Sequence, residues 1–280
     1  MQTQTSQRLL LLGKIFFSVV AFFFVIFLQT IVLEAIPTDT LSKPIFFVIS
    51  GGLGILFGMS IFALFVKGVD DEKFISSDWL SLRNRGKDFF IGGLIGCASV
   101  VLGFLVIINI DWSQVAIAPF RGSYLLGSFF MILCAAFLEE LFFRGYMFRK
   151  LLESFSLITS LLISSVIFGA LHYLNDGATI LSTANVILVG MVMGLMFLKT
   201  QNIWLVTGFH AIWNYVQAIL GFNVSGNECP SILTLHFESE NFFNGGYFGL
   251  EGSYICTIIL LLLLCLFYKS TKRQKANSCK

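Results

Sequence analysis

Six polar side chains lie in otherwise apolar stretches of this 280-residue chain. They are Glu139, Glu140, Arg144, His172, His210 and Asn214. Ionisable groups in apolar surroundings are energetically costly and rare, so each one is a candidate functional residue. Two carboxyl groups, two imidazoles and an amide form a set that can activate a water molecule and stabilise an oxyanion. The residue types therefore indicate acid–base chemistry.

The spacing of these residues gives the two glutamates different tasks. Neighbours on a helix point about 100° apart, and Glu140 lies four residues before Arg144, the spacing of a helical ion pair. Glu139 is left unpaired, which suits a general base or acid. His210 and Asn214 are also four residues apart and share one helix face. The alternative is structural, with these side chains bonding to neighbouring helices or capping a loop.

The segments that carry these residues have the composition of a membrane protein. Of all residues 56% are apolar and 12% are charged, and the mean hydropathy is +0.86. A soluble domain has about a quarter of its residues charged, so a soluble fold and a disordered chain are both excluded. The net charge of +2 does not favour nucleic-acid binding. A helix that spans a bilayer needs about 20 mostly apolar residues. We identify eight such runs, at 15–33, 45–66, 89–110, 124–143, 157–174, 180–198, 203–220 and 254–268.

The distribution of basic residues supports this division into eight runs. Cytoplasmic loops of membrane proteins are rich in Lys and Arg. With eight spans, 16 of the 18 Lys and Arg fall on one side, and only Lys43 and Arg121 fall on the other. The sequence therefore predicts an all-α polytopic membrane protein with about eight transmembrane helices and both termini cytoplasmic. Residues 221–253 would form a long outer loop.

Depth in the membrane constrains how the polar residues can meet. If the turn before the fifth run lies near Ser154, Glu139 is 15 residues before this turn and His172 is 18 residues after it. The difference corresponds to about 4–5 Å of helical rise. His210 is only nine residues beyond Gln201. Its helix must therefore start deep or tilt strongly.

Small residues within the runs are interpreted as packing residues. Glycines four apart allow helices to approach closely in lipid. Three pairs have this spacing, namely Gly54 and Gly58, Gly92 and Gly96, and Gly190 and Gly194. The six cysteines show neither zinc-site spacing nor a disulfide framework, and we expect them to pack as small apolar side chains.

Three motifs in a fixed order carry a resemblance to a known family. They are Glu139-Glu140-x-x-x-Arg144, Phe168-x-x-x-His172 and His210-x-x-x-Asn214. Together they resemble the signature of the CPBP family of intramembrane proteases. This family includes the type II CAAX prenyl endopeptidases and the bacterial Abi proteins linked to bacteriocin self-immunity. The resemblance covers roughly residues 125–220.

The resemblance implies eight helices around an intramembrane cavity and a role for each motif. The catalytic residues would be Glu139, His172, His210 and Asn214, with support from Glu140, Arg144 and Phe168. In this scheme the first glutamate and the first histidine activate the water that attacks a peptide carbonyl. The second histidine and the asparagine hold the oxyanion.

Metal dependence is left open by the sequence. Family members are commonly called metalloproteases, and Glu139, His172 and His210 could supply three zinc ligands. The chain has no His-Glu-x-x-His motif, the pattern of many zinc proteases. We therefore favour a glutamate-activated water that needs no cofactor, and keep zinc as the alternative.

These observations predict three regions and one preferred function. Residues 1–120 would form the first three helices, 121–220 the catalytic core, and 221–280 the outer loop, the last helix and a basic tail. We expect a protease of a bacterial plasma membrane that acts on a peptide or a lipid-modified protein, in contact with membrane lipid and without nucleic acid. Two alternatives from other classes are a non-catalytic bacteriocin self-immunity or membrane assembly factor and a proton-coupled transporter.

Overall fold

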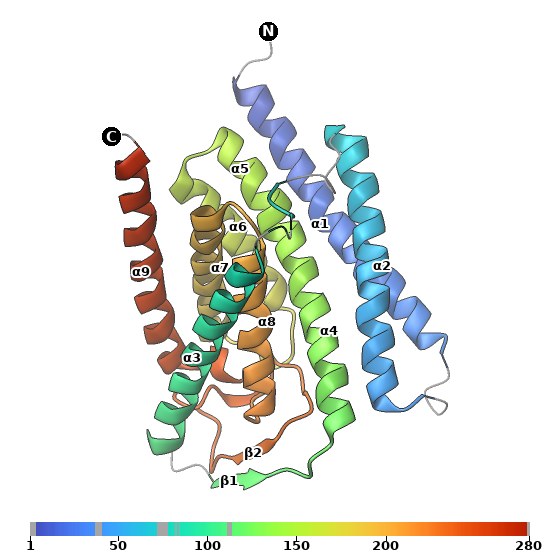
Figure 1. Cartoon of the computed structure of the whole chain (residues 1–280), viewed down its shortest axis with the longest axis vertical. Helices are drawn as coiled ribbons and strands as arrows, with labels where there is room; N and C mark the ends of the chain where they lie inside the picture. Colours follow the sequence, from blue (N-terminus) through green and yellow to red (C-terminus); the bar gives the residue numbers. More distant parts are fainter. Residues whose placement is uncertain are drawn as a thin grey trace.

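A computed structural model of the chain describes residues 4–36, 41–71, 78–81, 83, 85–110 and 114–278, without the side chains of residue 4 and of residues 273–278. The molecule is a helical bundle with one short ribbon of two strands (Figure 1). The longer helices are α1 (Gln4–Glu34), α2 (Lys43–Asp70), α3 (Gly86–Ile110), α4 (Gly122–Glu140), α6 (Leu157–His172), α7 (Ile180–Thr200), α8 (Trp204–Ile219) and α9 (Tyr254–Ser278). Each of the eight predicted runs lies on one of these helices, which confirms the all-α polytopic fold.

The helical segment that contains the fourth predicted run is longer than the run itself. After α4 the chain continues through a π-helix, η3 (Leu141–Phe148), into α5 (Arg149–Ser154). Together they form one apolar segment of 33 residues. The turn near Ser154 is present, and α6 begins with a cap in which Ser156 Oγ accepts a hydrogen bond from the backbone N–H of Thr159 (3.2 Å).

The count of eight full spans is approximate. Among the described residues, six helical segments are long and apolar enough to cross a membrane. The helices α6 and α8 have 16 residues each, or about 24 Å of rise, less than the roughly 30 Å of a hydrocarbon core. Just beyond the end of α6, Asn175 Nδ2 donates to the carbonyl of Ser225 in the outer loop (2.9 Å), so part of this loop packs against the end of the helix. Irregular backbone is tolerated at membrane depth when protein surrounds it.

Both termini lie at the same end of the bundle (Figure 1). The opposite end carries the ribbon, in which β1 (Gln114–Ile117) pairs antiparallel with β2 (Leu233–His236). The outer loop also contains two short 3-10 helices, η4 (Gly246–Phe248) and η5 (Leu250–Gly252). The shared end of the termini agrees with an even number of crossings. That this end is cytoplasmic stays a prediction.

The three glycine pairs lie at helix contacts, as predicted. A Cβ at Gly92 or Gly96 of α3 would overlap the backbone carbonyls of Leu205 and Phe209 on α8. The other two pairs face Gln29 and Leu138, and Ser165 and Leu161. The five described cysteines form no disulfide, and Cys279 lies outside the described residues.

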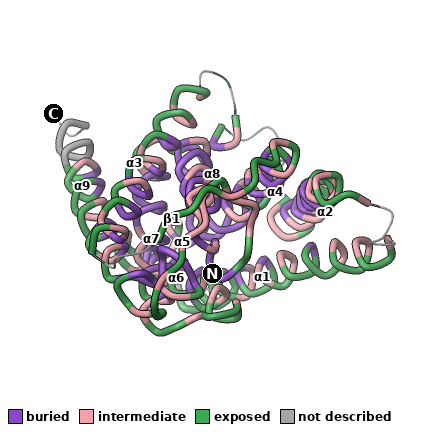
Figure 2. Tube along the Cα trace, turned by 90° about the horizontal axis from the view of Figure 1, so that it is seen from below, coloured by how far each residue is buried: buried purple, intermediate pink, exposed green. Residues whose placement is uncertain are grey.

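Burial is greatest in the middle of the bundle. Figure 2 shows buried positions concentrated on α4 and α8, whereas α1 at the edge is mostly exposed or intermediate. The helices α4, α6 and α8, which carry the predicted site residues, are therefore positioned by the core of the molecule.

Candidate active site

The two adjacent glutamates are the last residues of α4, directly before the π-helix η3. A π-helix adds a residue to each turn, and such segments occur frequently at functional sites. All eight residues of η3 are buried. Gly145 within it lies against the ring of Trp79, where a side chain would overlap the ring. The sequence did not predict this π-helix, because its residues are ordinary apolar helix formers.

Glu140 is fully buried and binds two other site residues. Its Oε1 accepts hydrogen bonds from Arg144 Nη1 (2.9 Å) and His210 Nδ1 (2.8 Å). Arg144 Nη2 also donates to the carbonyl of Gly190 on α7 (3.3 Å). The ion pair expected from the spacing of Glu140 and Arg144 is present. The same carboxyl group also connects α4 to α8, which the sequence did not indicate.

Glu139 faces both histidines of the motifs. Its Oε2 lies 4.0 Å from His172 Nε2 and 3.8 Å from His210 Nε2. This buried oxygen has no hydrogen-bond partner in the described part of the chain. His172 Nδ1 donates to the carbonyl of Phe168 (2.8 Å), and His210 Nδ1 donates to Glu140. Because each Nδ1–H is held by an acceptor, both Nε2 atoms are directed at Glu139.

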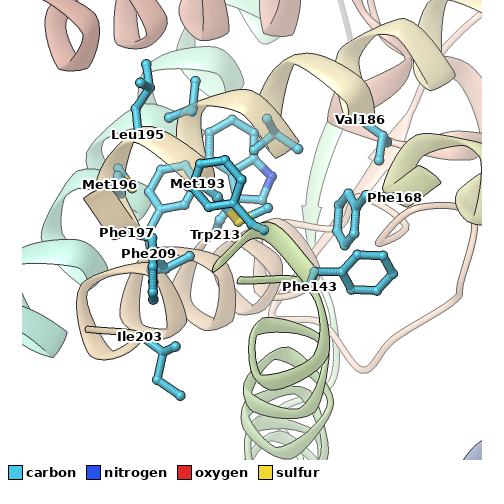
Figure 3. Close-up of a cluster of buried hydrophobic side chains, with 14 of the residues drawn as sticks. Phe143, Phe168, Val186, Met193, Leu195, Met196, Phe197, Ile203, Phe209 and Trp213 are labelled. Atoms are coloured by element: carbon cyan, nitrogen blue, oxygen red, sulfur yellow. The ribbon is translucent and has the colours of Figure 1, made fainter. Parts of the chain in front are cut away.

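The ring of Phe168 packs against several site residues at once. Its centroid lies 4.4 Å from that of His172, and it meets His210 edge-on at 6.2 Å. The guanidinium carbon of Arg144 is 4.5 Å from the ring centre, a cation–π contact. Phe143 of η3 packs beside it at 5.0 Å (Figure 3). Phe168 thus supports the imidazoles and the guanidinium from one side.

Two cavities meet at His172. A narrow one of about 10 Å³, room for one water molecule at most, is lined by His172, His210 and Asn214. A wider one of about 300 Å³ is lined by Glu139 and His172, together with apolar side chains of α1 such as Phe22. The structure therefore brings all four predicted catalytic residues to adjoining cavities, with Asn214 on the narrow one.

The start of α8 explains how His210 reaches the site. Asn202, in the turn before α8, is fully buried. Its Nδ2 donates to the carbonyls of Asp78 and Ser81 (both 3.1 Å), in the connection between α2 and α3. These bonds hold the turn before α8 against the described residues 78–81, so the start of α8 is buried within the protein.

One acidic residue beside the site was missed by the sequence reading. Glu251, from the outer loop, is buried and lines the narrow cavity. The outer loop contains other acidic residues that are exposed, including Glu238 and Glu240. The one available signal was the position of Glu251 in an apolar and glycine-rich stretch directly before α9.

The predicted zinc ligands do not form a metal site as they are arranged here. No three His, Cys, Asp or Glu side chains of the described residues are grouped closely enough to hold a metal ion. The distances of 3.8 and 4.0 Å from Glu139 Oε2 to the two Nε2 atoms exceed the roughly 3.3 Å expected between ligands of a tetrahedral zinc ion. The metal-free mechanism and its zinc alternative both stay predictions.

The fold and the site define a polytopic integral membrane protein with a buried glutamate and histidine centre. Residues 121–216 match the family of the type II CAAX prenyl endopeptidase Rce1-like proteins, which confirms the resemblance inferred from the three motifs. This segment covers α4 to most of α8 and contains every site residue predicted from the sequence. No curated protein and no solved structure matches the chain.

Proposed function

We propose that this protein is an intramembrane endopeptidase that hydrolyses a peptide bond of a membrane-associated or lipid-modified substrate. The arrangement around Glu139 Oε2 carries this proposal. This oxygen is buried and unpartnered, and two imidazole Nε2 atoms face it within 4.0 Å. A water molecule beside these three atoms would have one strong proton acceptor and two further groups to orient it.

In the proposed reaction Glu139 acts as the general base. It takes a proton from the water, with His172 orienting the water, and the water oxygen adds to the carbonyl carbon of the substrate. The carbonyl oxygen becomes negatively charged. When the C–N bond breaks, the proton held by Glu139 passes to the leaving nitrogen, so that the products are a carboxylic acid and an amine.

The oxyanion would be held by His210 and Asn214. His210 is hydrogen-bonded through Nδ1 to Glu140, so a protonated imidazole there would donate from Nε2. Asn214 lines the same narrow cavity and offers an amide N–H. Arg144 balances the charge of Glu140 and keeps that carboxyl group in place.

The wider cavity supports a substrate with an apolar portion. Phe22, Phe23 and Ile26 of α1 line one wall, whereas Asn175 and Asn227 lie at a polar edge. An apolar side chain or a lipid group could occupy the first part while amides bond the peptide backbone at the second. We further propose that the protein works in a bacterial plasma membrane.

The deciding experiment compares the wild type with Glu139→Gln in membranes, at equal protein level. Gln keeps the size of the side chain but cannot accept the proton. Glu34→Gln, an exposed change at the end of α1, serves as the matched control. We expect new peptide ends, identified by mass spectrometry of membrane proteins and lipopeptides, in the wild type and the control but not in Glu139→Gln.

The same experiment distinguishes the protease from a non-catalytic factor, and a repeat of it tests the metal. If all three proteins give identical fragments and the biological phenotype is unchanged, the protein is a non-catalytic factor and not a protease. Repeating the wild-type assay with a zinc chelator tests the metal. Fragments that persist under chelation support the glutamate-activated water, whereas their loss and return on adding zinc would support a zinc-bound one.

A further inference from the structure

The outer loop places a carboxyl group beside the candidate active site. Glu251 in η5 is only 4% exposed and lines the same narrow cavity as His172, His210 and Asn214. It lies outside the segment that matches the endopeptidase family. Burying a carboxyl group is unfavourable unless hydrogen bonds compensate for the lost water. Hydrogen bonds from neighbouring groups must therefore compensate for the burial of Glu251.

Glu251 accepts hydrogen bonds from three side chains. Its Oε1 binds Trp213 Nε1 (3.1 Å) and Gln217 Nε2 (3.2 Å), both on α8. Its Oε2 binds Ser225 Oγ (2.5 Å), within the outer loop. In the part of the chain that the structure describes, no Lys, Arg or His is paired with Glu251. Neutral donors alone hold this carboxyl group.

The two donors on α8 share a helix face with His210. Trp213 and Gln217 follow His210 by three and seven residues, and residues with this spacing lie on one side of a helix. A group that binds both side chains resists rotation of α8 about its own axis. Since His210 faces Glu139 only in one rotational setting of α8, Glu251 acts on the position of this imidazole.

The same contacts reach the helix of the other histidine. Asn175, three residues after His172, donates from Nδ2 to the carbonyl of Ser225 (2.9 Å). Ser225 in turn donates to Glu251. A continuous series of hydrogen bonds therefore runs from the end of α6, through the outer loop, to the face of α8 that carries His210.

The segment that carries Glu251 is itself anchored. Asn185 Nδ2 on α7 donates to the carbonyls of Glu251 (2.8 Å) and Ser253 (2.9 Å). Thr257 Oγ1 of α9 donates to Asn185 Oδ1 (2.7 Å). The loop segment that carries Glu251 is thus bonded to α7 and α9, while the Glu251 side chain binds α8.

From these contacts we infer that Glu251 is a positioning residue, which sets the separation of the His172 and His210 imidazoles by linking α6 to α8 through the outer loop. The inference rests on the proposed peptidase function for its catalytic consequence. Its structural content, an effect on α8, can be measured without any activity.

The test compares the purified full chain as wild type, Glu251→Gln and Glu238→Gln in detergent, using only the monodisperse fraction. Glu238 lies in the same loop but is exposed, so the same chemical change there is the matched control. In Glu251→Gln the side chain loses its charge and one of its two acceptor oxygens, so the Ser225 hydroxyl must accept from the new amide instead of donating to it. We expect kcat for a cleaved peptide to fall about 10- to 100-fold in Glu251→Gln, since small misplacements of catalytic groups have effects of this size. We expect KM to stay within about threefold, because the wider cavity is not lined by Glu251.

The second readout is amide hydrogen exchange of residues 210–219. Faster exchange there in Glu251→Gln, with the control unchanged, supports the inference. This holds even if no variant cleaves a peptide, because the absence of cleavage would count against the peptidase function and not against the effect of Glu251 on α8. Equal kcat and equal exchange in all three proteins would overturn it. If Glu251→Gln yields no monodisperse protein, Gln217→Met is used in its place. We expect kcat of that variant to be about 3- to 10-fold lower than that of the wild type. A kcat equal to the wild-type value would overturn the inference.

Discussion

The helices α8 and α1 both border the candidate site, but they are held very differently. Eleven of the 16 residues of α8 are buried. The turn before it is tied to Asp78 through Asn202, its middle to α4 through Glu140, and its outer part to the outer loop through Glu251. Along its length it touches the backbone of α3 at the glycine contacts.

In contrast, α1 lies at the edge of the bundle (Figure 2). Only four of its described residues are buried. Its polar contacts to α2 are an ion pair of Lys14 with Asp70 and hydrogen bonds from Gln29 to Ser50. Segments with few buried contacts open more easily than the core. The helix carrying His210 and Asn214 is therefore held by more contacts within the protein than the helix lining the wider cavity.

The largest effect is expected from breaking the contact that joins α4 to α8. Glu140→Gln leaves the buried guanidinium of Arg144 without its negative partner and should lower the free energy of unfolding by about 3–5 kcal/mol. Glu153→Gln is the control, since the Glu153 side chain is 52% exposed and water therefore reaches the carboxyl group in its pairs with Arg149 and Lys150. Unfolding in detergent measures both. Equal losses would contradict the central role of Glu140.

A smaller but clear effect is expected at the contact of α3 with α8. In Gly92→Ala the new methyl group would overlap the carbonyl of Leu205, so the helices must separate, at about 1–3 kcal/mol of stability. Gly52→Ala on α2 has open space at the same atom and should be neutral or slightly stabilising. Thermal unfolding of the two variants compares them directly, and similar melting temperatures would show that α8 is not tightly packed here.

The ends of the two helices can be compared through their amide side chains. Asn202→Ala removes a fully buried amide and its hydrogen bonds to the carbonyls of Asp78 and Ser81, which should reduce stability by about 1–3 kcal/mol. Gln29→Ala on α1 should reduce it by about 1 kcal/mol or less, because the Gln29 side chain, unlike that of Asn202, is only partly buried. A greater loss for Gln29→Ala would reverse the comparison of α8 with α1.

The smallest effect on stability is expected on α1, where the change should instead alter substrate use. Ile26→Ala removes apolar surface from the wider cavity and should lower kcat/KM about 3- to 10-fold, mainly through KM. Ile31→Ala alters a similarly exposed isoleucine of α1 that does not line this cavity, and should leave kcat/KM unchanged. Steady-state cleavage assays measure kcat/KM of both variants. Equal kcat/KM values would show that α1 does not contribute to the substrate site.

Much of the site could be predicted because its spacing is local. The four-residue spacing of Glu140 and Arg144 determines their contact on any helix, and the structure has it. The apolar runs predicted all eight longer helices, since hydrophobicity over about 20 residues is a property of the chain itself. The three motifs also predicted the resemblance that the family match over residues 121–216 confirms.

Other features depend on residues that are distant in sequence. The bond of His210 to Glu140 joins positions 70 residues apart, and no spacing rule relates them. The burial of Glu251 depends on donors from α8 and the outer loop. The contact of Asn175, just beyond α6, with Ser225 of the outer loop likewise joins positions 50 residues apart.

The sequence by itself thus determined the membrane character, the helical segments and the polar residues available for chemistry, because these depend on composition and on periodicity within one helix. Only the tertiary structure decided that both Nε2 atoms face Glu139 and that Glu251 stands beside α8. Such contacts follow from how helices pack and rotate against one another. That packing is set by the whole bundle and not by any single segment.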